Sequence, residues 1–411
     1  MLGLGLLVVA CSDGPPDAEE GAREPIGPAE TMADSIQRLF DSTYARAEVT
    51  VYEDSVPSCG RCELRLVPVG RFGDLDDRYL LRDLPLLVER DSRGRFYATV
   101  HGAADQELIL YESDGTVVRQ VGRPGGSGPG EFLRGVTSLL VGPGDSLHVV
   151  HDAVMVSVFD SAGTHLRTSR LGTGTNVPPT LLNVDEYGYL VAFRGIVSPG
   201  AVVAGYRLHR FAHDGTHLES FGRPGLTDLQ MALRAGTPLI AGPTGAWRGR
   251  DGGVWLLHGL YYRLERIDHR GEVDRVIGVR PPPRWHMLLS LDLQDVGGVI
   301  KLPDGRLKGF HELNTRLGIA VINVPSEEWE SVQTRPHHRY SDEGRLIAIE
   351  QYQEVWDAVL DVIDLETGKV LARKRLPRQS FLTRDGTLYS VYVDELGVIS
   401  VEAFEVEFLE G

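Results

Sequence analysis

The sequence contains little cysteine and no long apolar segment. Only three of its 411 residues are cysteines, too few for a disulfide-rich scaffold or a four-cysteine zinc site. The apolar run Leu2 to Ala10 is shorter than the roughly 20 residues that a membrane-spanning helix needs. The chain also lacks the HExxH motif of zinc proteases and the Gly-x-Ser-x-Gly elbow of serine hydrolases.

Positive charge is in short supply as well. The chain has 42 Lys and Arg against 58 Asp and Glu, a formal net charge of −16. An acidic surface repels phosphate backbones, so nucleic acid is a poor partner. It gives no basic patch to hold anionic lipid either, so any membrane contact is expected through a lipid anchor alone.

Glycine and proline are plentiful, with 48 and 23 residues. This turn-rich composition favours many short strands over long helices. Hydrophobic residues make up 42% of the chain, enough for a sizeable core. One all-β closed domain is therefore compatible with the chain length.

The N-terminus has the pattern of an export signal. The apolar run ends at Val8-Val9-Ala10-Cys11, which resembles the lipobox of bacterial lipoproteins, although basic residues before the run are missing. The resemblance implies that Cys11 becomes the lipid-modified N-terminus of an extracytoplasmic, membrane-anchored protein of the bacterial cell envelope. The alternative is a short hydrophobic leader with an accidental cysteine.

The segments that follow divide the chain further. Residues 12–35 are rich in Pro, Gly, Ala, Asp and Glu and read as a disordered tether. After a signal peptide at 1–11 and this tether, we expect an N-terminal extension at 36–61 and one β-propeller at 62–411.

A repeat carries the fold prediction. Short turns that end in glycine recur, each followed by an apolar strand, and a second glycine turn follows in most units. Units of strand, turn, strand, loop, strand, turn and strand at spacings of about 40 to 60 residues are typical of propeller blades. The first turns are Ser92-Arg93-Gly94, Gly142-Pro143-Gly144, Glu186-Tyr187-Gly188, Arg250-Asp251-Gly252, Pro303-Asp304-Gly305, Asp342-Glu343-Gly344 and Arg384-Asp385-Gly386.

The count of units is seven, with six as the alternative. The weakest unit spans Val296 to Val332, and if it merges with a neighbour the ring has six blades. The last unit ends with its third strand at Ser400 to Phe408. We predict that Glu63 to Gly70 supplies its fourth strand and closes the ring.

Two motifs resemble a known family. The connection Gly122 to Phe132 is similar to the Gly-rich GPGEF segment of NHL-type propellers and of bacterial six-bladed propeller lipoproteins, and the turn Phe159-Asp160-Ser161-Ala162-Gly163 fits the same pattern. The resemblance implies a propeller over residues 62–408 and little about function, since propellers host many activities. The same run lacks the Lys-Ser/Thr and helix of a phosphate loop.

Cys59 and Cys62 form a CxxC pair. Glu63 replaces the histidine of a c-type haem site, and no further cysteine outside the lipobox can complete a zinc site. In an oxidising compartment we expect a local disulfide. A redox or metal role is the alternative.

A possible ligand site lies at one end of the ring. Aligning the units puts a set of polar residues at equivalent positions near the end of the second strand. They are His151, Arg194, His258, His311, Glu350 and Tyr392. The hypothesis is an axial rim that binds a small ligand, with zinc or another divalent metal possible on the three histidines. The alternative, favoured because no ligand-spacing motif is present, is that each residue bonds within its own blade.

If the protein is an enzyme, the rim is its candidate active site. With its three histidines, Arg194 and Tyr392, it faintly resembles the zinc site of the propeller lyase that cleaves α-hydroxyglycine peptides. A lactonase-like calcium site is weakly supported, because no repeat-phased set of asparagines is found. No catalytic residue and no cofactor can be assigned.

The long connection that contains Arg284, Trp285 and His286 is a second candidate binding surface. The sequence favours a ligand- or protein-binding module over an extracytoplasmic enzyme. It identifies neither the ligand nor an envelope partner.

Overall fold

The computed structural model describes residues 47–52, 57–73, 81, 87–101, 106–193, 206–222, 245–258, 263–279, 306–326, 356–394 and 398–411. This part of the chain is built from strands, with one short 3-10 helix at Pro143–Asp145. It contains no helix of the length and apolarity needed to cross a bilayer.

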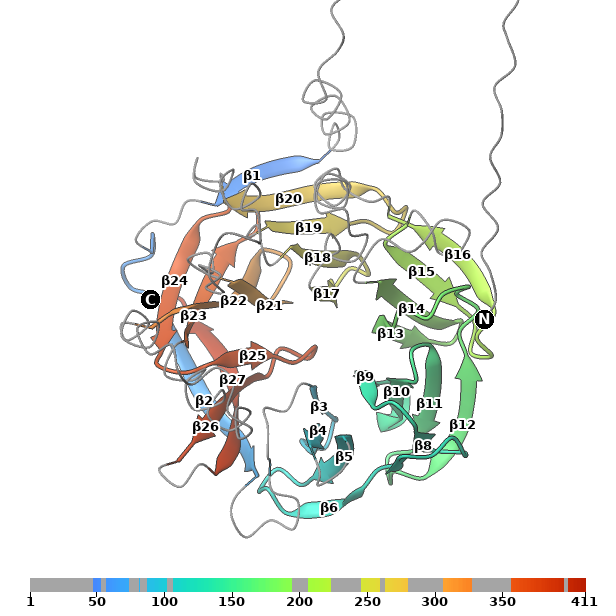
Figure 1. Ribbon diagram of the computed structural model, residues 1–411. Coiled ribbons are helices and arrows are strands. Elements are labelled where there is room, and N and C mark those ends of the chain that lie inside the picture. Colours follow the sequence, from blue (N-terminus) through green and yellow to red (C-terminus); the bar gives the residue numbers. More distant parts are fainter. Residues whose placement is uncertain are drawn as a thin grey trace, which may run out of the picture.

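The described strands form six blades of four antiparallel strands around a common axis, a closed β-propeller (Figure 1). The first strand of each blade lies nearest the centre of the ring. Blades 1 to 3 are β3 (Val88–Arg90), β4 (Phe96–His101), β5 (Gln106–Tyr111), β6 (Val117–Gln120); β9 (Val136–Val141), β10 (Leu147–His151), β11 (Met155–Phe159), β12 (His165–Arg170); and β13 (Pro179–Asp185), β14 (Gly188–Phe193), β15 (Leu208–Phe211), β16 (His217–Phe221). Blades 4 to 6 are β17 (Gly245–Arg248), β18 (Val254–His258), β19 (Arg263–Ile267), β20 (Val273–Val279); β21 (Arg306–Glu312), β22 (Leu317–Pro325), β23 (Trp356–Asp364), β24 (Val370–Leu376); and β25 (Ser380–Leu382), β26 (Leu388–Val393), β27 (Ile399–Leu409), β2 (Glu63–Phe72).

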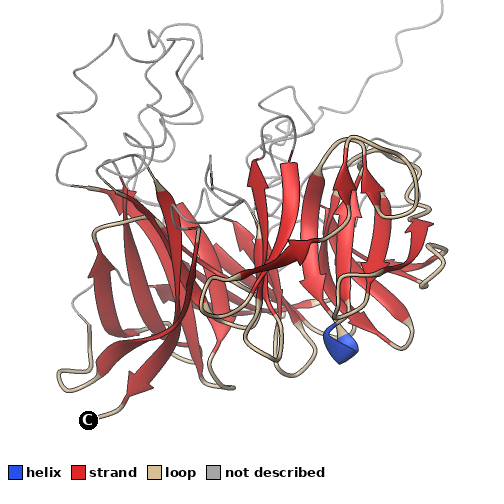
Figure 2. Cartoon of the chain, turned by 90° about the horizontal axis from the view of Figure 1, so that it is seen from below, coloured by secondary structure: helices blue, strands red, loops and turns tan. Residues whose placement is uncertain are grey.

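The strands run between two faces of the ring, seen from the side in Figure 2. The hairpins between first and second strands lie on the face that also carries the 3-10 helix and the C-terminus, and we call it the hairpin face. Connections between blades open on the opposite face, called the connection face. The Gly-rich run is one of them: its β7 (Arg123–Pro124) and β8 (Glu131–Phe132) pair in parallel and lead from blade 1 to blade 2.

The core lies between neighbouring blades. Middle strands such as β10 and β14 are buried along their whole length, because each blade packs both of its faces against its neighbours. Their near-continuous apolar sequences follow from this two-sided burial. Outer strands such as β12 alternate between exposed and half-buried positions.

The ring closes as the sequence predicted. β2 pairs antiparallel with β27 from Glu63 opposite Leu409 to Phe72 opposite Val401. The outermost strand of the last blade therefore comes from the N-terminal end of the chain. This pairing covers the long edge of β27, which would otherwise be open to association.

The blade count of seven is wrong, and the alternative of six is correct. The two units predicted around Val296 to Val332 and Asp342 to Gly344 merge into blade 5. The hairpin between its first two strands has no glycine, because the side-chain oxygen of Asn314 accepts hydrogen bonds from the backbone N–H groups of Arg316 and Leu317, both at 2.8 Å. The first glycine turns predicted for these units fall outside the described residues.

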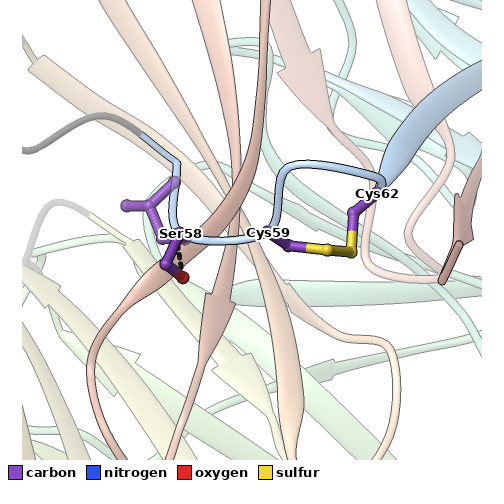
Figure 3. Close-up of a disulfide and its surroundings, with 4 residues drawn as sticks. Ser58, Cys59 and Cys62 are labelled. Atoms are coloured by element: carbon purple, nitrogen blue, oxygen red, sulfur yellow. Dashed lines mark hydrogen bonds between the residues drawn. A yellow bond between two sulfur atoms is a disulfide. The ribbon is translucent and has the colours of Figure 1, made fainter.

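The N-terminal segment contacts the outer strands of three successive blades. β1 (Glu48–Tyr52) pairs in parallel with β20 of blade 4. Ser58 then donates hydrogen bonds from its backbone N–H and its hydroxyl to the carbonyl oxygen of Val370 on blade 5 (Figure 3), and β2 follows on blade 6. The parallel fifth strand was not predicted from the sequence.

A disulfide joins Cys59 and Cys62 between the blade 5 contact and β2 (Figure 3). It closes a loop of four residues at the point where the chain passes from one blade to the next. Such a bond restricts the unfolded chain and holds the entry into the closing strand.

Replacing both Cys59 and Cys62 with serine is expected to lower the free energy of unfolding by about 2 kcal/mol, since a loop this short restricts the unfolded chain only a little. Urea unfolding of the oxidised protein and the double variant measures the difference. A loss several times larger would mean that the closing strand depends on the disulfide for its pairing.

Candidate functional site

His151 points into its own blade rather than toward the axis. Its Nδ1 lies 2.8 Å from a carboxylate oxygen of Asp152, and its Nε2 lies 2.8 Å from the hydroxyl of Ser157. The hydroxyl of Ser157 also lies 2.7 Å from the hydroxyl of Thr168. The set has the residue types of a serine hydrolase triad, but the Ser157 hydroxyl is fully buried and is satisfied within the blade by His151 and Thr168.

Blade 3 repeats this arrangement with other residues. His209 occupies the place of Ser157, and its Nδ1 lies 2.8 Å from the hydroxyl of Ser220 on the neighbouring strand. His217 approaches the same hydroxyl at 2.8 Å. A network that recurs between the third and fourth strands of two blades stabilises those blades, because it satisfies polar groups that the ring buries.

The other predicted rim residues divide by position. Tyr392 lies near the end of β26 and His258 ends β18, both second strands that run toward the connection face, as β10 does. The side chain of His258 is not described. Arg194 and Glu350 lie outside the described residues, as do Arg284, Trp285, His286 and Cys11.

His311 lies toward the opposite end of the ring. It is on β21, the first strand of blade 5, one residue before that strand ends at the hairpin face. The repeat predicts a second strand here, because the glycine turn before His311 resembles the hairpin of a blade, but the residue lies on a first strand. His151 and His311 therefore do not share a site.

These positions do not fit a zinc ion bound by three histidines. Both ring nitrogens of His151 already have partners, and a metal ligand needs a free lone pair. In the described part of the chain no three His, Cys, Asp or Glu side chains are grouped to hold a metal.

Another polar group lies along the axis and joins three blades. Arg384, in the hairpin between β25 and β26 of blade 6, places its Nε 3.5 Å from the carboxylate of Glu89 on β3 of blade 1. Its Nη2 donates a hydrogen bond to the hydroxyl of Ser138 on β9 of blade 2, at 3.3 Å. We call Arg384, Glu89 and Ser138 the axial cluster. All three strands involved lie at the centre of the ring in Figure 1.

His311 and Asp385 lie beside the axial cluster. The histidine ring contacts the tip of the blade 6 hairpin, so closely that a Cβ on Gly386 would come within 2.5 Å of it. Burial lowers the pKa of His311, and the nearby carboxylate of Asp385 opposes that shift. Among the predicted rim residues whose side chains are described, His311 is the one that lies near the axial cluster.

Glu89 is the titratable group of the cluster. Burial raises its pKa to about 7, while the charge of Arg384 lowers it and that of Asp385 raises it further. The carboxyl group therefore exchanges its proton near neutral pH. It can act as a hydrogen-bond donor below this pH and as a charged partner of Arg384 above it.

No sequence pattern indicates this cluster. Arg384 belongs to a glycine turn that was recognised, but arginine also occurs in the turns at Arg93 and Arg250. Only ring closure brings the hairpin of the last blade next to the first strands of blades 1 and 2. Glu89 and Ser138 are isolated polar residues in short apolar strands.

Comparisons with known proteins add little beyond the fold. No protein-family model and no curated protein matches the chain, so the NHL-type resemblance stays a prediction. The solved structures include a member of the DUF4221 family from Bacteroides vulgatus, with 11% identity, a TM-score of 0.49 and coverage of 85% of this chain and 99% of that one. Another is virginiamycin B lyase from Staphylococcus aureus, with 11% identity, a TM-score of 0.41 and coverage of 84% and 99%. At such scores neither supports an argument about activity.

Proposed function

We propose that this protein is a lipid-anchored β-propeller of the bacterial cell envelope that binds a carboxylate-bearing ligand at its axial cluster. The observation that carries the proposal is Arg384, a half-buried cation that reaches from blade 6 to groups on blades 1 and 2. Arginine suits the recognition of carboxylates, because its planar fork of N–H donors matches their oxygens.

The proton on Glu89 would control this binding. Below pH 7 the carboxyl group is mostly neutral and no longer competes with an anionic ligand for the charge of Arg384. Above pH 7 the ionised Glu89 competes with the ligand for the guanidinium group. Affinity should fall about tenfold between pH 6 and pH 8, since the protonated fraction falls by about that factor.

Calorimetric titration of residues 12–411 with acetate, succinate and N-acetylglycine tests the site. We expect one molecule of at least one compound to bind at pH 6, more weakly at pH 8 and not measurably to the Arg384→Gln variant. Arg65→Gln is the matched control, because Arg65 is an exposed arginine on the outer strand β2. Absence of binding by all three compounds at pH 6, or equal binding by the Arg384→Gln variant, would contradict the proposal.

Two features support the location in the envelope. The Cys59–Cys62 disulfide is typical of oxidising compartments outside the cytoplasm. The segment around Cys11 resembles a lipobox.

The Cys11→Ala variant of the full chain, expressed in a bacterial host, is expected to move from the detergent-rich phase to the aqueous phase in cloud-point partition. Replacing the cysteine removes the site of lipid attachment and so most of the membrane affinity. The intact chain should carry the mass of the lipid. An intact chain that stays in the aqueous phase without added mass would contradict lipidation.

An enzyme is the second candidate, on the single observation that Glu89 titrates near neutral pH, as a general acid or base does. Binding is favoured because Glu89 lies beside the cation Arg384, and the hydroxyl group of the cluster, on Ser138, already accepts the backbone N–H of Leu181 at 3.0 Å.

A further inference from the structure

The contact between blades 5 and 6 changes character along the axis. Toward the hairpin face it is apolar, where Ile319 and Val321 of β22 pack with Leu382 and Leu388 of blade 6. Side chains alternate along a strand, so every second residue continues this contact toward the connection face. There the continuing residues are polar: Asn323 on β22, Ser380 on β25, Ser390 and Tyr392 on β26, and Ser400 on β27.

These polar residues lie at matching heights across the two blades. A Cβ on Gly309 of β21 would come 3.1 Å from the Cβ of Leu382, so these two positions face each other. β21 and β25 run in the same direction. From these two positions toward the connection face, β21 reaches its first residue, Arg306, at about the height where β25 begins at Ser380. Arg306 is the strand partner of Asn323. Asn323 thus faces the polar end of blade 6.

Asn323 is buried and has no partner. Its side chain is 1% exposed, and neither its amide nitrogen nor its amide oxygen makes a hydrogen bond within the described structure. Ser380 and Ser390 satisfy each other instead, with their hydroxyl groups 2.7 Å apart. A buried amide that lacks partners costs free energy unless another molecule supplies them.

Arg378 adds an unpaired cation at the same end. It precedes β25 on the connection face, and its guanidinium group stacks on the ring of Tyr392 at 3.9 Å. Its Nε and Nη1 are buried and form no hydrogen bond to any described residue. Burial lowers the pKa of Arg378, and only the charge of Glu402 opposes this. Glu402 is itself shared with Arg71 at 3.7 Å.

We infer that Arg378, Asn323 and Tyr392 form a binding site for a small hydroxycarboxylate between blades 5 and 6. The carboxylate would accept hydrogen bonds from the unpaired N–H groups of Arg378. The hydroxyl group of the ligand would both donate to and accept from the amide of Asn323. The site is separate from the axial cluster, whose Arg384 lies in the hairpin at the other end of β25 and β26.

Crystals of residues 12–411 soaked with sodium L-malate or sodium L-lactate test the site directly. We expect density for the acid within hydrogen-bond distance of both Arg378 and Asn323. Calorimetry should show at least a tenfold loss of affinity in Asn323→Leu and in Arg378→Gln. Because Arg378 is only half-buried, its variant stays informative if Asn323→Leu fails to fold.

The axial variant Arg384→Gln provides the control that separates the two sites. In soaked crystals of this variant the density between blades 5 and 6 should stay as in the wild type, whereas its loss from that site in Arg384→Gln alone would overturn the inference. Water or an adventitious ion only at Asn323 in the soaked crystals would overturn it as well, as would equal affinity in both blade 5–6 variants.

Discussion

A chain that starts at Leu87, and so lacks β1 and β2, is expected to lose its cooperative unfolding transition and to associate. β2 is the outer strand of blade 6, and its removal exposes the edge of β27. It also carries Phe72, which is almost fully buried and stacks on Tyr111 of blade 1 at 4.8 Å. The strand therefore links the sheet of the last blade to the core of the first.

The size of this effect follows from the buried side chains. Removing a buried aromatic such as Phe72 costs about 3–5 kcal/mol through lost transfer energy and the cavity left behind. Deletion of the strand also removes the buried Leu64 and the strand pairing itself. The sum is comparable to the roughly 5–15 kcal/mol by which folded domains are stable.

Urea unfolding followed by tryptophan fluorescence, together with size-exclusion chromatography, measures the outcome. The matched control starts at Pro57, which keeps β2 and loses only β1, and should unfold cooperatively as a monomer. Phe72→Ala in the full chain should lose about 3–5 kcal/mol. A monomeric Leu87 chain with the transition of the control would mean that closure by β2 does not hold the ring.

The Glu89→Gln variant is expected to remove a pH-dependent loss of stability. The pKa of Glu89 rises from 4.5 to about 7 on folding, so between these values the folded state binds more protons than the unfolded state. Stability from this group is therefore full below pH 4.5 and falls as pH rises through 7. The shift corresponds to roughly 3 kcal/mol.

Other groups act on the same pH range, so the comparison must be a difference between variants. Burial lowers the pKa values of His148 and His209 to about 4. These histidines are destabilising where they must stay neutral in the folded state, and stability from them grows as pH rises from 4 to 6.5. Subtracting the profile of Glu89→Gln from that of the wild type isolates Glu89.

Urea unfolding at pH 5 and pH 8 gives this difference. Glu89→Gln should gain about 3 kcal/mol relative to the wild type on going from pH 5 to pH 8. The control Glu405→Gln, an exposed carboxylate paired with Arg90, should follow the wild type. An unchanged difference would place the pKa of Glu89 in its ordinary range and remove the proton switch from the proposed function.

The repeat could be predicted from the sequence because a local rule produces it. Each tight turn needs a residue that tolerates positive φ, and glycine supplies it at Gly94, Gly252 and Gly386. The closing strand could be predicted for a similar reason, since an incomplete last unit needs a fourth strand. The blade count failed where Asn314 replaced glycine and the chain between β22 and β23 became long.

The candidate site depends on contacts that no local pattern encodes. The position of His151 in the repeat predicts a rim residue, but its side chain instead contacts Asp152 and Ser157 of its own blade. Arg384 and Glu89 are separated by almost the whole ring in sequence and become neighbours only through closure. Strand periodicity predicts on which face of the sheet a side chain lies, but it cannot predict which blade packs against that face.

The most direct test of the central claim is the nuclear magnetic resonance signal of the Nε–H group of Arg384 during a succinate titration at pH 6, assigned by its absence in Arg384→Gln. Binding at the axial cluster predicts a shift that saturates with the calorimetric affinity and weakens at pH 8. A signal that stays constant during the titration would contradict the axial cluster as the ligand site, whether or not calorimetry detects succinate binding.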